Sequence, residues 1–209
     1  MLLEKIKCTI GITRDPVKSA IQNMMWEVYR AMPSARLKLM FKDYCFLAGG
    51  SIRSLYTGKK VKDWDIFFKS DSMAKYFIEV LKLTNPDGKY IFKFESKHTY
   101  TIMVNGEEIQ FCLGQYAGEP EYVISKFDYT NSMAYYDLSS AELVLPEKFI
   151  NACDNKLIEF NPDAFTPKVA AQRYNSFEDD GWIDVTPLTT ARSIVKSLGK
   201  RSKDDNSFG

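Results

Sequence analysis

The sequence predicts a mixed α/β (α+β) fold. We expect a small, mixed, twisted sheet with flanking helices and a short helical C-terminal extension. Short apolar runs that end at Gly, Asn or Asp indicate strands, and apolar residues at helical spacing between them indicate helices. Of the 209 residues, 45% are hydrophobic and 14% aromatic, which is enough for a packed core. We expect a main domain at 1–145, a helical extension at 146–188 and a mobile basic polar tail at 189–209.

The N-terminal part is expected to be mostly helical. Asp15 and Pro16 suit the N-cap and the first position of a helix, so we expect a helix from Pro16 to Met32. A short strand is expected at about 7–12, before that helix, and a further helical turn at 36–42.

The stretch 45–68 organises the rest of the chain. CFLAGG reads as a buried strand that ends at two glycines, SIRSLYTG as a short helix that ends at Gly58, and WDIFF as a second strand. Asp63 and Asp65 flank Trp64, so their carboxylates share one face of that strand. Two adjacent carboxylates repel each other unless a cation lies between them, and oxygen ligands suit Mg²⁺ or Mn²⁺. The glycine turn offers backbone N–H groups to a phosphate.

Further elements follow at regular intervals. A helix capped by Ser70 or Asp71 should run to Leu83, and Asn105-Gly106 should form the turn of a hairpin. The remaining expected strands are 90–95, 100–104, 108–113, 133–136 and 142–145. The remaining expected helices are 119–126, 146–157 and 167–177, the last ending at Gly181-Trp182.

Two motifs carry a resemblance to a known family. The pattern Gly49-Gly50-Ser51-x-Arg53, then Gly58, then Asp63-x-Asp65 resembles the catalytic motif of DNA polymerase β-type nucleotidyltransferases. It is most similar to the head domain of bacterial poly(A) polymerases and class II CCA-adding enzymes. Downstream, Asp128-Tyr129-Thr130 and Tyr136-Asp137 resemble a second family segment at the same internal spacing. The resemblance covers about residues 45–182, and two motifs in the right order are far more specific than either alone.

The resemblance implies roles for the motif residues. Gly49, Gly50 and Ser51 would hold the β- and γ-phosphates of an NTP such as ATP, and Arg53 would offset phosphate charge. An ion pair between Arg53 and one of the acids is the alternative. Asp63 and Asp65 would be the catalytic metal ligands, with Mg²⁺ or Mn²⁺ as cofactor.

The family also carries a third catalytic carboxylate on a strand beside the Asp-x-Asp strand. Here either Glu108 or Gln110 fills that position. Glu108 would complete the catalytic set, whereas Gln110 would supply a poorer metal ligand that cannot act as a base.

Three further residues are implied as nucleotide-binding: Lys126, Asp128 and Arg173. The alternatives are a turn-forming role for Asp128 and a surface position on a helix for Arg173. The family has two arginines before the aspartate where this chain has Lys126-Phe127, and an aspartate where this chain has Ser54.

The predicted function is that of a compact, phage-type nucleotidyltransferase. It would transfer a nucleoside monophosphate from an NTP to an acceptor hydroxyl and release pyrophosphate. An RNA 3′ end is the favoured acceptor, with a protein or a small molecule as alternatives, because only residues 146–209 follow the head where the RNA enzymes have large helical domains. The competing hypothesis is a nucleotide-binding or interaction module on the same fold with little or no catalysis.

Charge and hydropathy limit the remaining functions. The net charge of +1 argues against a broad nucleic-acid-coating surface, although the basic run 192–203 either contacts RNA phosphates or forms a solvated tail. No apolar run approaches the roughly 20 residues that span a bilayer. The start lacks a signal peptide, and the four cysteines are scattered without a CxxC pair. We therefore expect a cytoplasmic protein with no membrane partner.

Overall fold

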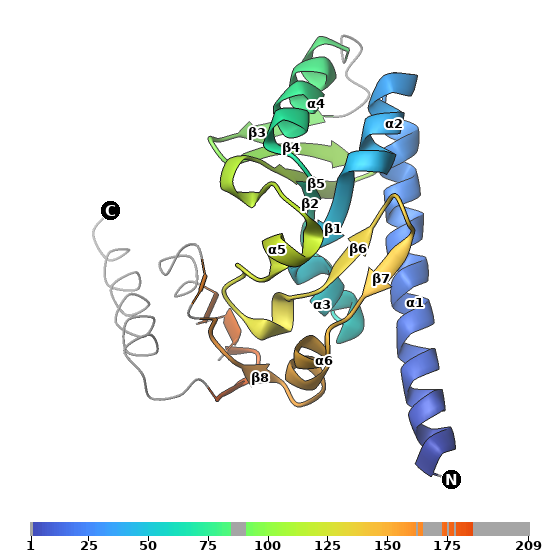
Figure 1. Cartoon of the computed structure of the whole chain (residues 1–209), viewed down its shortest axis with the longest axis vertical. Coiled ribbons are helices and arrows are strands. Elements are labelled where there is room, and N and C mark those ends of the chain that lie inside the picture. Colours follow the sequence, from blue (N-terminus) through green and yellow to red (C-terminus); the bar gives the residue numbers. More distant parts are fainter. Residues whose placement is uncertain are drawn as a thin grey trace, which may run out of the picture. The chain divides into compact units, whose positions relative to one another are not determined.

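The computed structural model supports the predicted fold class (Figure 1). The chain divides into two compact units, Met1–Val123 with Tyr135–Val144, and Ile124–Ala134 with Leu145–Gly209. The structure describes residues 2–84, 91–161, 163–164, 173–174, 176–177 and 179–185. The expected tail at 189–209 lies outside the described residues.

The first unit contains a seven-stranded mixed sheet in the order β3-β4-β5-β2-β1-β6-β7. Its strands are β1 (Cys45–Ala48), β2 (Trp64–Phe68), β3 (Ile91–Glu95), β4 (Thr99–Val104), β5 (Glu107–Cys112), β6 (Tyr135–Asp137) and β7 (Glu142–Val144). Strands β2 and β5 pair in parallel, and the other neighbours pair antiparallel. The α/β prediction with a small mixed sheet is therefore confirmed.

The helices of this unit are α1 (Leu2–Ala31), α2 (Ala35–Tyr44), α3 (Gly50–Tyr56) and α4 (Asp71–Leu83), with a 3₁₀ turn η1 (Gly114–Tyr116). A short helix α5 (Pro120–Ile124) also begins in this unit, and its last residue, Ile124, is counted with the second unit. Helix α4 begins and ends where the sequence predicts. The expected strand at 7–12 is wrong, because α1 already begins at Leu2 and continues through Pro16. The missing N–H of Pro16 removes one main-chain hydrogen bond from a helix without ending it.

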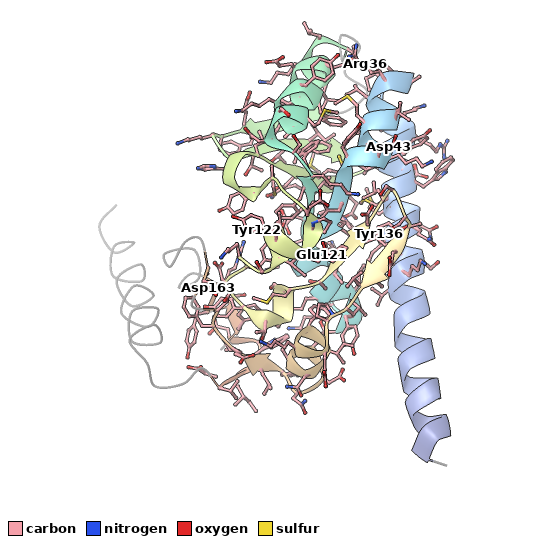
Figure 2. All side chains as sticks on the ribbon, in the orientation of Figure 1. Arg36, Asp43, Glu121, Tyr122, Tyr136 and Asp163 are labelled. Carbon is pink, nitrogen blue, oxygen red and sulfur yellow. The ribbon has the colours of Figure 1, made fainter. Side chains whose placement is uncertain are left out.

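One face of the sheet forms the core with the helices. Phe77 of α4 lies 5.3 Å from Phe68 and 5.2 Å from Phe111, measured between ring centroids. Ile66 and Ile109 are fully buried on the same face. Helices α2 and α4 pack on each other (Figure 1), and Arg36 of α2 lies over the Tyr76 ring of α4 at 4.6 Å (Figure 2).

The hairpin between β4 and β5 fixes the register of the strands that carry the candidate site. Asn105 and Gly106 both have positive φ, 51° and 84°, as a two-residue type I′ turn requires. The turn pairs Val104 with Glu107, and the pairing of β4 with β5 continues residue by residue to Thr99 opposite Cys112.

The second unit has its own small core. It contains the 3₁₀ turn η2 (Thr130–Ser132), α6 (Glu147–Asp154) and a parallel pair of short strands, β8 (Leu157–Ile158) and β9 (Ile183–Asp184). Tyr129 packs edge-on against Phe177, which in turn packs against Trp182. Part of the expected helix 167–177 lies outside the described residues. Gly181, just after its described part, has a φ of 76°, as expected for a glycine that ends a helix.

The described part of the chain contains no helix that is long and apolar enough to cross a membrane.

Candidate functional site

The glycine turn at the end of β1 has a backbone shape that favours glycine. Gly49 has φ 89° and ψ −133°, a combination that side chains with a Cβ rarely adopt. A Cβ added to Gly50 would lie 3.5 Å from Arg53 Nη2. The Arg53 side chain therefore folds back over the turn that the family resemblance predicts to bind phosphates.

Ser51 adds an unsatisfied polar group to this turn. Its side chain is 1% exposed, and its hydroxyl has no hydrogen-bond partner in the described structure. A buried hydroxyl without a partner costs about 1–3 kcal/mol. Such a group is suited to a ligand oxygen that completes its hydrogen bonding.

The two aspartates lie at the same end of the sheet as the glycine turn. Leu47 of β1 pairs with Ile66 of the antiparallel β2. The chain therefore leaves β1 into the glycine turn at the end of the sheet where β2 begins. Asp65 is the second residue of β2, and Asp63 directly precedes the strand.

Gln110 joins the acids into one polar cluster. It pairs with Asp65 across the parallel β2 and β5 strands. Its Nε2 donates hydrogen bonds to Glu108 Oε1 at 2.8 Å and to Asp63 Oδ2 at 3.5 Å. The strand position directly beside Asp65 thus holds an amide, and Glu108 lies two residues earlier on the same face of β5.

The donor set fits one divalent cation. Asp63 and Asp65 offer the hard oxygen ligands that Mg²⁺ and Mn²⁺ prefer, and the orphaned Ser51 hydroxyl lies in the adjacent turn. In the described residues there is no group of three or more His, Cys, Asp or Glu side chains arranged to hold a metal. A cation here would take its remaining ligands from the phosphates of an NTP and from water, as Mg²⁺ commonly does.

The three residues predicted further along the chain lie in the second unit. Arg173 Nη1 binds Asp128 Oδ2 at 2.7 Å, and the Asp128 side chain is only 5% exposed. Burial raises the pKa of Asp128, and the charge of Arg173 and its hydrogen bond lower it in part. Lys126 is half-buried. The predicted aspartate and arginine thus bind each other, and nucleotide contacts by these three residues remain a prediction.

Sequence reasoning missed two residues on the acid-bearing face. Phe94 of β3 and Thr101 of β4 lie on the row of paired residues that contains Gln110. Alternation of polar and apolar residues in 108–111 was a signal for the face that carries Glu108 and Gln110, but that alternation does not mark Phe94 or Thr101. The register needed to align them is not visible in the sequence.

Solved structures show the same fold. A Thermotoga maritima CCA-adding enzyme complexed with tRNA matches with a TM-score of 0.60 and 17% identity, over 95% of this chain and 47% of the enzyme. A CCA-adding enzyme in complex with CTP matches with a TM-score of 0.56 and 15% identity, over 87% of this chain and 44% of that enzyme. The resemblance that the sequence motifs indicate is therefore confirmed at the level of the fold.

Sequence comparison identifies a phage family. The chain is 25% identical over 153 residues to a protein of Bacillus phage SPbetaL7 named Gabija anti-defense 2, across 73% of this chain and 37% of that protein. This chain thus matches little more than a third of the relative's length. The sequence model described as "Gabija anti-defense 2 family protein" matches residues 17–156. Since that match spans more than half of the chain, the protein belongs to the Gabija anti-defense 2 family.

Proposed function

We propose that this protein is a metal-dependent nucleotidyltransferase that moves a nucleoside monophosphate from an NTP to an acceptor hydroxyl, with an RNA 3′ end as the favoured acceptor. One observation carries the proposal: the pairing of β1 with β2 brings the Gly49–Ser51 turn and the Asp63–Asp65 pair to the same end of the sheet. A phosphate-binding turn beside two carboxylates suits the transfer of a phosphoryl-linked group.

Some residues of the chain would bind the NTP phosphates, and others would compensate their negative charge. The backbone N–H groups of the turn and the Ser51 hydroxyl would bind the β- and γ-phosphates, while Arg53 would offset their charge. A divalent cation held by Asp63 and Asp65 would neutralise charge that develops at the α-phosphate.

The reaction is a substitution at the α-phosphorus. The oxygen of the acceptor hydroxyl forms a bond to that phosphorus, the bond to the β-phosphate oxygen breaks, and pyrophosphate leaves. Glu108 is the carboxylate beside Gln110 that would accept the proton of the hydroxyl. Positioning of the NTP and the acceptor hydroxyl would supply most of the remaining rate acceleration.

The family name supports a biological role for this activity. We infer that the protein counters Gabija defense in the host cell of a phage, as the name of its relative states of that protein. Nucleotide transfer would then modify a component on which that defense depends.

A second function is favoured by one specific observation. Gln110 lies beside Asp65 and donates hydrogen bonds into the acidic cluster. An amide there is a weak metal ligand and no base. A nucleotide-binding module without transfer would have the same turn and the same aspartates.

The test is transfer of label from α-labelled NTPs, each supplied with Mg²⁺ or Mn²⁺ and a mixture of bacterial RNA and protein. The wild type is compared with the Asp63→Asn/Asp65→Asn double variant. Asp43→Asn on α2 (Asp43 is labelled in Figure 2) is the matched control. It makes the same chemical change just before the start of β1, whereas the glycine turn follows the other end of that strand.

We expect label in RNA with the wild type and the control, and none with the double variant. Bound NTP without transferred label would contradict the proposal and favour the binding module. Equal transfer by the double variant would contradict the assigned role of the two aspartates.

A further inference from the structure

A row of paired residues leads from the edge of the sheet to the acidic cluster. Phe94 pairs with Thr101, Thr101 pairs with Gln110, and Gln110 pairs with Asp65. Directly paired residues on neighbouring strands point to the same face. The four side chains therefore line one face across β3, β4, β5 and β2.

This face is hollowed next to the cluster. A cavity of about 470 Å³ is lined by Phe94, Thr99, Thr101, Glu108 and Gln110. Its size lies in the range of small-molecule sites. At its outer end Phe94 is 57% exposed, a large aromatic ring held open to solvent. At its inner end are a carboxylate and an amide.

The chemistry of the lining suits a flat heterocycle. The exposed ring of Phe94 offers a stacking surface, while the Thr99 and Thr101 hydroxyls and the Glu108 carboxylate offer hydrogen-bonding groups. The Gln110 amide nitrogen already faces Glu108 and Asp63, so its carbonyl oxygen adds an acceptor. A nucleobase presents one aromatic face and a polar edge, which matches this combination.

The position of the cavity relative to the proposed phosphate-binding turn indicates which group would occupy it. The glycine turn follows β1, on one side of β2, whereas the cavity covers β5, β4 and β3 on the other side. In an in-line substitution the attacking oxygen enters opposite the leaving pyrophosphate. With the phosphates at the turn, the attacking group comes from the side of the cavity.

A second hollow adjoins the first and is lined by two lysines and two glutamates. A cavity of about 310 Å³ is lined by Lys60, Lys62, Met103, Glu107, Glu108 and neighbouring residues. It shares Glu108 with the first cavity. Lys60 and Lys62 are both exposed, so they can contact the phosphodiester of a strand whose base lies on Phe94.

We infer that the cavity lined by Phe94, Thr101 and Gln110 binds an unpaired base at the end of a single-stranded RNA acceptor, with Lys60 and Lys62 on its backbone. The inference rests on the proposed function and adds an acceptor subsite to it. The base would place the terminal hydroxyl of its strand near Glu108 and Asp65.

The test is the affinity of a fluorescein-labelled single-stranded RNA hexamer of mixed sequence, measured by anisotropy in the absence of NTP. Stacking of one base on an aromatic side chain is worth about 1–3 kcal/mol, so Phe94→Ala should weaken binding roughly 5- to 150-fold. Phe94→Trp should keep the wild-type affinity. Lys60→Gln/Lys62→Gln should weaken binding and reduce its dependence on salt.

Tyr44→Ala is the matched control, since this aromatic side chain is also exposed but lies at the opposite end of the strands, where the Tyr44 carbonyl accepts from Lys69 N–H. It should bind RNA like the wild type. Wild-type affinity in Phe94→Ala, or no hexamer binding by the wild type, would overturn the subsite. Thermal midpoints of all variants report whether each one folds.

The Asp63→Asn/Asp65→Asn variant separates this inference from the proposed function. It should bind the hexamer at least as tightly as the wild type and transfer no nucleotide. If the wild type also transfers nothing, yet its RNA binding depends on Phe94, the transfer proposal fails and the subsite stands. If Phe94→Ala binds the hexamer and transfers nucleotide to RNA like the wild type, the subsite fails and the transferase stands.

Discussion

The side-chain amide of Gln110 donates a hydrogen bond to Glu108 Oε1 across 2.8 Å. The same nitrogen reaches Asp63 Oδ2 at 3.5 Å. The amide thereby donates to two carboxylates and separates their charges. An uncharged side chain thus links Glu108 to Asp63, and this relationship makes the first prediction.

Gln110→Glu should destabilise the protein in the absence of metal and increase its response to metal. The substitution removes two hydrogen bonds to carboxylates and adds a negative charge between them, which should cost roughly 1–3 kcal/mol. Mn²⁺ should then raise the thermal midpoint of the variant more than that of the wild type, because a third carboxylate strengthens the site.

Gln110→Met is the control for that experiment, because it removes the hydrogen bonds without adding charge. It should be destabilised and should not gain a metal response. An equal effect of Mn²⁺ on wild type and Gln110→Glu would show that Gln110 does not lie in a metal site.

Ser51→Ala should separate folding from nucleotide binding. The Ser51 hydroxyl is buried without a partner in the described structure, so its removal should leave stability unchanged or raise it by about 1 kcal/mol. NTP affinity should fall roughly tenfold, because a hydrogen bond to a charged phosphate is lost. Calorimetric titration with NTP and thermal unfolding measure the two effects. Unchanged NTP affinity would show that the Ser51 hydroxyl does not contact the nucleotide.

Arg173→Gln should destabilise the second unit at neutral pH. Asp128 is buried, and burial raises its pKa while Arg173 lowers it. Without the arginine the buried carboxylate has no cation, which should cost about 1–3 kcal/mol.

The pH dependence of this loss follows from the raised pKa. A group whose pKa is raised on folding favours the folded state below its unfolded pKa and opposes it as the pH rises through its folded pKa. The difference in the free energy of unfolding between wild type and Arg173→Gln should therefore be largest at neutral pH and shrink on acidification. Urea unfolding across that range measures it, with Arg173→Lys as the charge-preserving control. Lost NTP binding with unchanged stability would favour a direct nucleotide contact instead.

Asp137→Asn should destabilise the sheet at neutral pH, and this loss should decline only in more strongly acidic solution. Burial would raise the pKa of Asp137, but hydrogen bonds from Lys69 and Ser139 lower it below its ordinary value of 3.8. Lys69 Nζ lies 2.8 Å from Asp137 Oδ2. The loss should be about 1 kcal/mol at neutral pH.

A lowered pKa contributes stability above the unfolded pKa, and that stability is lost as the pH falls through the folded pKa. The difference in the free energy of unfolding between wild type and Asp137→Asn should persist down to about pH 4 and decline below it. Asp43→Asn makes the same chemical change on α2 and is the control. A difference that grows on acidification would contradict the role of Lys69.

Local signals predicted most of the elements that build the site. The β1 run ending at Gly49, the helix that begins after Ser70 and the Asn105-Gly106 turn all lie where the sequence placed them. Each is determined by a few adjacent residues. The helix start at Asp15 was the exception, because the structure continues α1 upstream through residues that have no distinct helical signal.

Contacts between distant residues could not be predicted. The choice between Gln110 and Glu108 depends on the parallel register of β2 and β5, whose partners Asp65 and Gln110 are 45 positions apart. The Asp128–Arg173 pair likewise spans 45 positions. No local pattern encodes either contact, because both arise from the packing of whole elements.

The central claim is that Asp63 and Asp65 hold a divalent cation against the phosphates of an NTP. Electron paramagnetic resonance of Mn²⁺, titrated with the protein in the presence and absence of a non-hydrolysable NTP analogue, tests it directly. We predict tight Mn²⁺ binding by the wild type and by Asp43→Asn only when the nucleotide is present, and its loss in Asp65→Asn. Nucleotide-dependent Mn²⁺ binding that is equal in Asp65→Asn, or absent from the wild type, would contradict the claim.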